Sequence, residues 1–210
     1  MVLTDFFDRT YCINLNRRQD KWRVCQNEFN KHSLNVERYE AIDGHIAKYS
    51  SVVSKGVLGC ALSHLGIVEI AKRDGLNTVL ILEDDVEFEE GLNEKFVERY
   101  KEVPKDWDML YLGGNHNARE ITNRFSPHLL KIHNTNATHA YALKSTVFDA
   151  IIERMEYINL PVDIIYKEIQ RKVNSYCFSP RLAWQRPGLS DVLDVMVDYS
   201  FIKDNDGLFR

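Results

Sequence analysis

The sequence predicts an α/β fold with a mostly parallel central sheet flanked by helices. Runs typical of strands alternate with helical stretches as far as residue 112, a pattern typical of parallel sheets covered by helices. The run from Thr78 to Leu82 has no polar break, as in a strand that is buried on both faces. A chain of 210 residues is long enough for one large domain with a sizeable core. We therefore expect a single domain over residues 1–210, with antiparallel strands added at the sheet edge.

The first half of the chain supplies the predicted parallel strands and the helices between them. Strands are expected at residues 10–15, 36–42, 78–82 and 107–112, and helices at 19–31, 59–73 and about 92–100. In the first of these helices, Trp22, Cys25 and Phe29 form one apolar stripe. The second predicted strand ends in Asp43–Gly44, a turn pair in which the glycine can adopt positive φ.

The second half adds elements beyond the alternating pattern. Residues 129–132 and 139–143 are predicted to be strands added antiparallel at the sheet edge, followed by helices at 147–155 and 161–173. Two late strands are expected at 175–178 and 182–184, and a loop over the same end of the sheet at 185–191. Residues 115–127 contain turn formers without periodicity, which favours a mobile loop.

Composition and charge exclude several classes of protein. Hydrophobic residues make up 44% of the chain and charged residues 28%, which are ordinary globular values, and the net charge is −4. This charge gives no electrostatic argument for binding nucleic acid. No apolar run approaches the roughly 20 residues of a membrane span, and the first residues carry acids where a secretory signal carries bases. Four scattered cysteines are typical of free thiols. We expect a soluble, intracellular (cytoplasmic) protein.

The buried strand at residues 78–82 runs directly into the acidic residues Glu83, Asp84 and Asp85. Packing does not favour this arrangement, because desolvated like charges repel and cost several kcal/mol unless they are neutralised. A divalent cation would neutralise them, and ligands of open α/β sheets bind beyond the carboxyl ends of strands. The alternative is a solvated acidic turn that caps the next helix.

Two further groups are candidates for the same end of the sheet. Arg17 and Arg18 stand between the first strand and its helix, where a diphosphate is favoured; their alternative is solvated surface. His64 lies on the apolar row of the helix at 59–73, so it is either a hydrogen-bonded core histidine or a functional one.

Seven motifs occur in an order that resembles a known family. They are Cys12–Arg18, Ala41–Gly44, Gly59–His64, Leu80–Val86, Trp107–Gly113, Ala140–Ala142 and Pro161–Asp163. From about residue 10 to residue 191, the chain resembles glycosyltransferase family 25, the group of lipooligosaccharide and procollagen galactosyltransferases. This resemblance implies a GT-A fold, a nucleotide-sugar donor, a divalent cation that is usually Mn²⁺ (or Mg²⁺), and inversion at the anomeric carbon.

The resemblance also implies roles for individual residues. The nucleotide-binding part would span about residues 10–113 and the acceptor-side part about residues 114–210. The donor, a UDP-linked hexose, would contact Asn14, Leu15, Arg17, Arg18, Asp43, Gly44, His64, Glu83 and Asp84. Asp85, with Asp84, would hold the metal, while Glu83 is directed to a ribose hydroxyl. Inverting transfer needs a base near the acceptor hydroxyl, and Asp163 is the first candidate, with Asp191 second; the alternative for Asp163 is a carboxylate that complements a helix dipole.

The chain departs from the family in ways that keep two other functions open. No histidine follows His139, so the late histidine that completes the metal shell in many GT-A enzymes is missing. Residues 67–70 lack the tryptophan of many members, and the chain is short after Ser190. A non-catalytic nucleotide-sugar or glycan-binding module is therefore one alternative. A metal-dependent phosphohydrolase is the other, although the acidic run lacks the Asp-x-Asp-x-Thr pattern. The expected acceptor is a glycan or glycoprotein.

Overall fold

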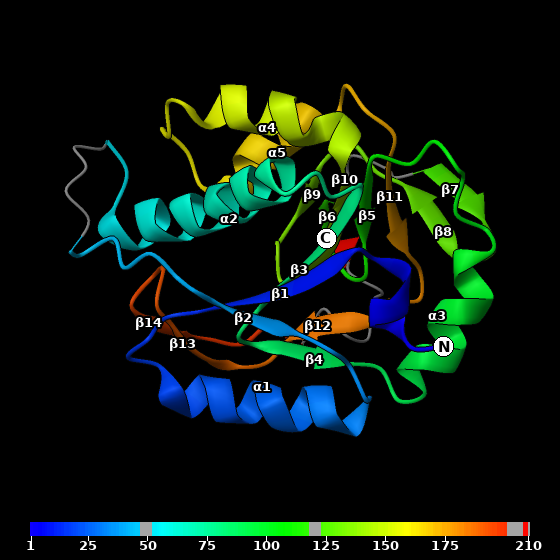
Figure 1. Ribbon diagram of the computed structural model, residues 1–210, viewed down its shortest axis with the longest axis horizontal. Coiled ribbons are helices and arrows are strands. Elements are labelled where there is room, and N and C mark those ends of the chain that lie inside the picture. Colours follow the sequence, from blue (N-terminus) through cyan, green and yellow to red (C-terminus); the bar gives the residue numbers. More distant parts are fainter. Residues whose placement is uncertain (47–51, 118–122, 201–207, 210) are drawn as a thin grey trace.

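The computed structural model describes residues 1–46, 52–117, 123–200 and 208–209. An eight-stranded sheet forms the centre of the molecule, in the order β2-β1-β3-β10-β5-β11-β8-β7. Parallel pairing joins β2, β1 and β3, and also β5 and β11. The predicted α/β class with a mostly parallel central sheet is confirmed (Figure 1). The strands in spatial order are β2 (Glu37–Glu40), β1 (Arg9–Asn14), β3 (Thr78–Glu83), β10 (Ala140–Lys144), β5 (Met109–Tyr111), β11 (Ser175–Phe178), β8 (Leu129–Lys131) and β7 (Asn123–Ser126).

One predicted strand lies elsewhere than expected. The strand predicted at residues 139–143 is β10, which pairs antiparallel with both β3 and β5 in the middle of the sheet. The prediction that it is added at the sheet edge is therefore wrong. Four of its five residues are buried, and this burial on both faces suits a central position. The antiparallel strands at the edge are β8 and β7.

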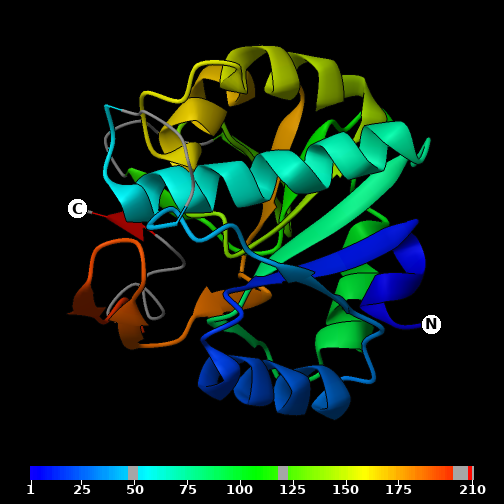
Figure 2. The same cartoon turned by 60° about the vertical axis from the view of Figure 1, so that its left-hand side comes forward.

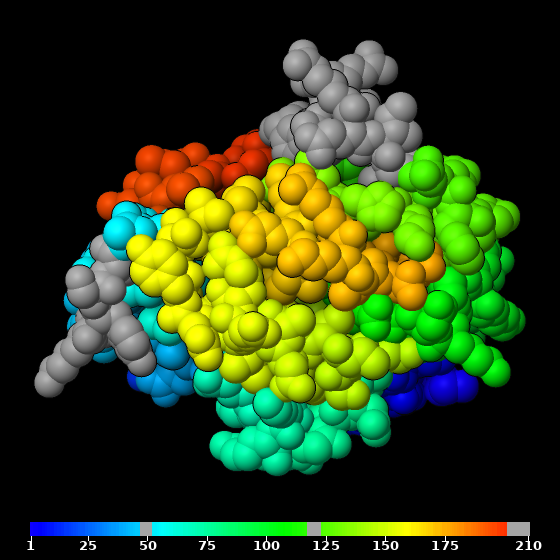
Figure 3. Space-filling model, turned by 90° about the horizontal axis from the view of Figure 1, so that it is seen from above, coloured from blue at the N-terminus to red at the C-terminus, as the bar shows by residue number. Residues whose placement is uncertain are grey.

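Helices cover both faces of the sheet. One face carries α2 (Lys55–Arg73), α4 (Phe148–Met155) and α5 (Val162–Gln170), and the other carries α1 (Gln19–Lys31) with α3 (Leu92–Tyr100) and the 3-10 turn η1 (Leu3–Phe6) (Figures 1 and 2). Figure 3 shows α4 and α5 forming one surface of the molecule. Two buried apolar clusters result, one on each face of the sheet. Each contributes to stability by removing apolar surface from water.

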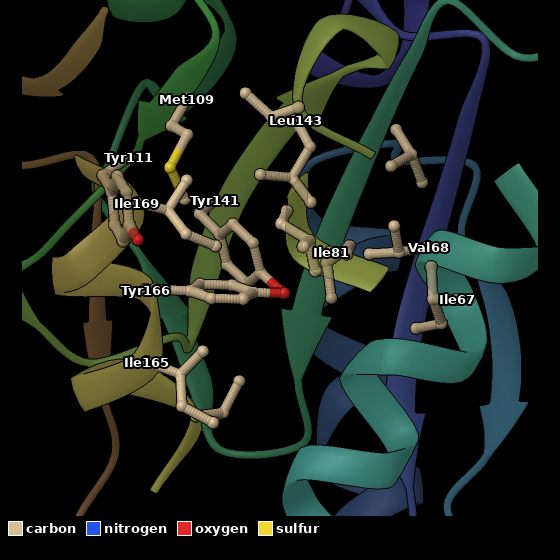
Figure 4. Packing of buried hydrophobic residues seen from close by; sticks show 14 of the residues in the cluster. Ile67, Val68, Ile81, Met109, Tyr111, Tyr141, Leu143, Ile165, Tyr166 and Ile169 are labelled. Carbon is tan, nitrogen blue, oxygen red and sulfur yellow. The ribbon is translucent and has the colours of Figure 1, made fainter. Parts of the chain in front are cut away.

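Three tyrosines form the centre of the cluster beneath α2, α4 and α5. The rings of Tyr111 and Tyr141 stack with centroids 5.5 Å apart, and Tyr166 meets Tyr141 edge-on at 5.5 Å. Figure 4 shows these rings packed among Ile81, Met109 and other apolar side chains of the sheet and α5. Buried tyrosine hydroxyls need hydrogen-bond partners, and the hydroxyl of Tyr141 donates to that of Tyr166 at 3.2 Å.

Short strand pairs lie outside the central sheet. β4 (Val86–Phe88) pairs with β12 (Ala183–Gln185), and β13 (Gly188–Ser190) pairs with β14 (Val195–Val197) in a hairpin. Residues 188–190 of the loop predicted at 185–191 therefore form strand β13, and a turn at residues 191–194 joins it to β14. A third small sheet joins β15 (Leu208–Phe209), β6 (Asn115–Asn117) and β9 (Thr135–Asn136). The loop predicted at 115–127 begins with β6 and ends with β7, and its residues 118–122 lie outside the described residues.

Several local predictions are confirmed or refined. α2 begins four residues earlier than predicted, because Ser54 caps it by accepting a hydrogen bond from the Val57 amide. None of the four cysteines, all of which lie in the described ranges, forms a disulfide, and Cys12, Cys25 and Cys177 are buried. None of the helices in the described ranges combines the length and apolarity needed to cross a bilayer.

Candidate active site

A cavity of about 500 Å³ lies at the carboxyl ends of β1, β2 and β3, where ligands of open α/β sheets bind. The strand ends supply one wall, the N-terminal half of α2 and the start of α5 supply another, and the turn of the β13–β14 hairpin closes one side. Ten residues predicted for the site line this cavity: Leu15, Arg17, Asp43, Gly44, His64, Glu83, Asp84, Asp85, Asp163 and Asp191. Asn14 and Arg18 are not among the lining residues.

Asp85 lies in the turn that joins β3 to β4, and its carboxylate is poorly neutralised. Burial, together with the charges of Glu83 and Asp84, raises the pKa of Asp85 to about 7. Its Oδ1 atom is buried and has no hydrogen-bond partner among the described residues. An unpaired buried acceptor is costly, so this oxygen is available to a positively charged ligand.

Asp84 is fixed in place by its neighbours. The side-chain amide of Asn14 donates to its Oδ2 at 2.7 Å, and the Lys21 ammonium lies 3.3 Å from its Oδ1. Burial nevertheless raises the pKa of Asp84. Asn14 is itself buried and accepts hydrogen bonds from the Arg38 guanidinium. It therefore orients Asp84 from behind the cavity wall.

Glu83 is held as a carboxylate at the end of β3. The hydroxyl of Thr138 donates to it at 2.5 Å, and Nε2 of His64 lies 3.3 Å from the same oxygen. Burial acts to raise the pKa of Glu83, but the nearby His64 imidazole and the hydrogen bond from Thr138 outweigh burial and lower it. His64 is fully buried, and its Nδ1 lies 2.8 Å from the hydroxyl of Tyr141. His64 is therefore a core histidine that also lines the cavity, and its functional interpretation stays a prediction.

Three cations converge on the carboxylate of Asp191, in the turn after β13. Arg17 Nη1 lies 2.8 Å from Oδ1, Lys21 Nζ lies 3.0 Å from Oδ2, and Arg18 donates to Oδ2 as well. Asp191 is partly buried, which acts to raise its pKa, but Lys21 and the two arginines hold the pKa below the ordinary value. Sequence reasoning missed Lys21. Its place in the first turn of α1, three and four residues after Arg18 and Arg17, was the available signal.

Asp163 faces the cavity from the first turn of α5. Its Oδ1 accepts a hydrogen bond from the adjacent Ile164 amide at 2.9 Å, as a residue at a helix start does. The thiol of Cys60 in α2 lies close enough to both Asp163 and the strand-end acids to be affected by their charges. Burial and the charges of Glu83, Asp163, Asp85 and Asp84 together raise the pKa of the Cys60 thiol. Asp163 therefore shares the cavity with the acidic triplet while belonging to a different wall.

Gly44 is required by close packing and not by its backbone angles. Its φ is not among the positive values of the described glycines. A Cβ atom at Gly44 would lie 1.8 Å from the carbonyl oxygen of Lys55, at the start of α2. The expected use of positive φ is wrong here, and the glycine instead lets the turn after β2 pack against α2.

A divalent cation fits the strand-end acids in charge and chemistry. Asp84 and Asp85 supply hard oxygen ligands of the kind that Mg²⁺ and Mn²⁺ prefer, and the unpartnered Oδ1 of Asp85 is suited to such a contact. Among the described residues, no group of three or more His, Cys, Asp or Glu side chains is arranged to hold a metal. A cation would therefore need further oxygen ligands, which phosphate groups and water supply.

The comparison with known families identifies a class of protein. The family model described as "Glycosyltransferase family 25 (LPS biosynthesis protein)" matches residues 7–166, more than half of the chain. The chain belongs to glycosyltransferase family 25. This membership supports a role in glycosyl transfer, and the resemblance drawn from the seven motifs is confirmed.

Particular relatives place the chain within this family. Procollagen galactosyltransferase 2 of Mus musculus is 28% identical over 130 residues, which cover 51% of this chain and 21% of that protein. Inactive glycosyltransferase 25 family member 3 of Homo sapiens is 30% identical over 129 residues, covering 51% and 22%. The match thus spans about a fifth of the length of these relatives. A crystal structure of a glycosyltransferase involved in the glycosylation of the major capsid of PBCV-1 aligns with a TM-score of 0.40 at 9% identity, over 81% of this chain and 91% of that one.

Proposed function

We propose that this protein transfers a hexose from a UDP-linked donor to a glycan or glycoprotein acceptor, with a divalent cation and with inversion. The observation that carries the proposal is the unpartnered, buried oxygen of Asp85, beside Asp84, in the cavity at the carboxyl ends of the parallel strands. Family membership supports glycosyl transfer in general. The nucleotide, the sugar, the metal and the stereochemistry belong to the proposal.

Asp84 and Asp85 are the residues that would hold the cation, Mn²⁺ or Mg²⁺. When bound, such a cation supplies positive charge to the diphosphate leaving group, whose negative charge grows as the glycosyl bond breaks. Asn14 and Lys21 keep Asp84 in position, at 2.7 and 3.3 Å from its carboxylate oxygens. Because Asp84 is already held in place, less free energy is needed to order the metal site at each turnover.

Glu83 is suited to accept a hydrogen bond from a ribose hydroxyl. Its side chain remains partly accessible at 22% exposure, and its orientation is fixed by Thr138 and His64. His64 in turn contacts Tyr141, whose hydroxyl is bonded to that of Tyr166. The hydrogen bond from Thr138 and the adjacent buried His64 thus orient the Glu83 carboxylate toward the cavity, as a preorganised acceptor should be.

Asp163 is suited to act on the acceptor. In an inverting transfer the acceptor oxygen forms a bond to the anomeric carbon while the bond from that carbon to the phosphate oxygen breaks. The acceptor hydroxyl proton must pass to a base, and Asp163 faces the cavity from a wall separate from the acidic triplet. Asp191 is less suited to this step, because the three cations lower the pKa of its carboxyl and make it a weaker base.

A donor-hydrolysis assay tests the proposal. Purified protein with Mn²⁺ is incubated with a panel of nucleotide sugars, and release of nucleoside diphosphate is measured with and without chelator. We expect slow release from a UDP-hexose that depends on the metal and is abolished in Asp85→Asn. No release from any donor, together with metal-dependent binding, would favour the second candidate, a non-catalytic nucleotide-sugar-binding module. That candidate is supported by relatives named inactive within the family.

A further inference from the structure

The contacts of Asp191 suggest more than a structural ion pair. One carboxylate faces the side chains of Arg17, Arg18 and Lys21, and Asp191 is only 14% exposed. Each cation also has a second acid nearby: Arg17 Nε lies 3.0 Å from Asp43 and Lys21 Nζ lies 3.3 Å from Asp84. The second acid of Arg18 is Asp20, which is 67% exposed and is therefore weakly held. Among these acids, Asp191 is the carboxylate that contacts all three cations. An anion with several oxygens would be able to contact the same three cations in place of Asp191.

We propose that Asp191 is an internal competitor, whose carboxylate occupies an anion subsite for a diphosphate and leaves it when the diphosphate binds. The proposal rests on the proposed function only in identifying this diphosphate with that of the donor. The subsite consists of Arg17 and Lys21, which line the cavity, and Arg18, which lies behind Asp191. Displacement of Asp191 exposes Arg18 and frees the β13–β14 hairpin from the cavity wall.

The chemistry of the three cations matches phosphate. Guanidinium groups donate paired hydrogen bonds to phosphate oxygens, and lysine contributes a compact charge. All three precede or open α1, whose first amide groups favour anions in addition. During exchange, one anion replaces another on the same donors, so no cation is left buried without a partner at the end of the step. The competition thus adjusts affinity without requiring rearrangement of α1.

The hairpin that carries Asp191 is weakly held by other means. It lies outside the central sheet, below the N-terminal end of α2 in Figure 1. Its side chains are largely exposed, at 43% for Leu189, 52% for Val195 and 73% for Met196. Little apolar surface therefore fastens it, and segments of this kind open at low free-energy cost. The ion pairs of Asp191 are accordingly a main attachment of the hairpin among the described residues.

Gly56 shows how closely this turn approaches α2. A Cβ atom at Gly56 would lie 2.6 Å from the carbonyl oxygen of Val192 and 2.9 Å from that of Asp191. These contacts are with backbone atoms, so a side chain at Gly56 must shift the turn. Substitution of Gly56 by alanine is therefore a way to move Asp191 off its cations without changing any charge.

The test measures binding of inorganic pyrophosphate by calorimetry, in chelator and at constant ionic strength, because surface electrostatics depend on salt. If Asp191 leaves the subsite open for about one tenth of the time, removal of its charge strengthens binding about tenfold. We expect this gain in Asp191→Asn. Asp194→Asn is the matched control, since Asp194 is exposed in the same turn, and its affinity should remain that of the wild type. Unchanged or weaker binding in Asp191→Asn, or equal gains in both variants, would overturn the proposal.

Two further measurements keep the proposal testable should Asp191→Asn fold poorly. Gly56→Ala retains every charge and should also bind pyrophosphate more tightly; unchanged or weaker binding would contradict displacement. In the wild type, pyrophosphate should increase hydrogen exchange at amides 188–197, and protection or no change there would oppose the release of the hairpin. None of these readouts needs turnover. If pyrophosphate displaces Asp191 but the protein has no transferase activity, the proposed function is refuted and the displacement proposal stands.

Discussion

Replacement of Asp85 by asparagine tests the electrostatic basis of the site. Its carboxyl has an ordinary pKa of 3.8, which burial and the adjacent acids raise to about 7 in the folded protein. A carboxyl with a raised folded pKa costs no stability below the unfolded pKa, and its ionisation destabilises the fold progressively as pH rises from about 4 to 7. The difference of about 3 pKa units corresponds to about 4 kcal/mol at pH 8, at 1.36 kcal/mol for each unit.

Asparagine at position 85 is neutral at every pH, so the metal-free variant should escape this cost. The free energy of unfolding of Asp85→Asn relative to wild type should rise by up to about 4 kcal/mol between pH 4 and pH 8. Urea unfolding in chelator, followed by tryptophan fluorescence, measures the difference. Changes of shape and hydrogen bonding at residue 85 add an offset that does not depend on pH. The slope with pH is therefore the decisive quantity.

The reasoning fails if the stability difference between variant and wild type is the same at pH 5 and pH 8. Such a result would mean that Asp85 is solvated or already neutralised by a neighbour. The control is Asp194→Asn, a change of the same charge in an exposed turn, for which we expect no comparable slope. With Mn²⁺ added, wild type should gain stability through metal binding and Asp85→Asn should not.

Three further outcomes are expected. Calorimetry with a UDP-hexose should show binding with Mn²⁺ that weakens at least about tenfold in chelator, a loss of about 1.4 kcal/mol; equal affinity in both conditions would remove the metal role of Asp84 and Asp85. Asp163→Asn should reduce transfer by at least about a hundredfold while donor affinity changes little, because a general base acts mainly in the transition state; near-normal transfer would place the base elsewhere. Tyr141→Phe removes the hydroxyl that contacts His64 and should cost about 1–3 kcal/mol of stability, with weaker donor binding as Glu83 loses its fixed orientation. Donor affinity equal to wild type would show that the contact between Tyr141 and His64 serves stability alone.

The parts of the fold that the sequence predicts are those that local pattern determines. The apolar run of β3 and its acidic end follow directly from residues 78–85, and the stripe of Trp22, Cys25 and Phe29 correctly marks α1. The position of β10 does not follow from its own residues. Its neighbours β3 and β5 come from segments about 60 and about 30 residues earlier, respectively. A short apolar strand is equally compatible with an edge or a central place.

In the candidate site, too, some residues are predictable from local sequence pattern and others are not. Glu83, Asp84 and Asp85 stand out because three acids after a buried strand are unexpected for packing alone. Lys21 does not stand out, because a lysine in a surface helix is ordinarily solvated. Its role depends on Asp191, which is 170 positions away in the chain. The need for glycine at position 44 is likewise a matter of its approach to Lys55, which only the packed structure shows.

The acidic residues and the basic residues of the cavity are together complementary to one kind of ligand. Oδ1 of Asp85 has no hydrogen-bond partner among the described residues, whereas Arg17, Arg18 and Lys21 meet at Asp191 and pair with other acids as well. Lys21 reaches Asp84 and Asp191 but leaves Oδ1 of Asp85 unpaired. A metal–diphosphate pair has the complementary arrangement, with its cation for the acids and its phosphate oxygens for the bases. The free protein thus retains electrostatic free energy that such a ligand would release on binding, which is a physical reason for affinity and metal dependence to be coupled.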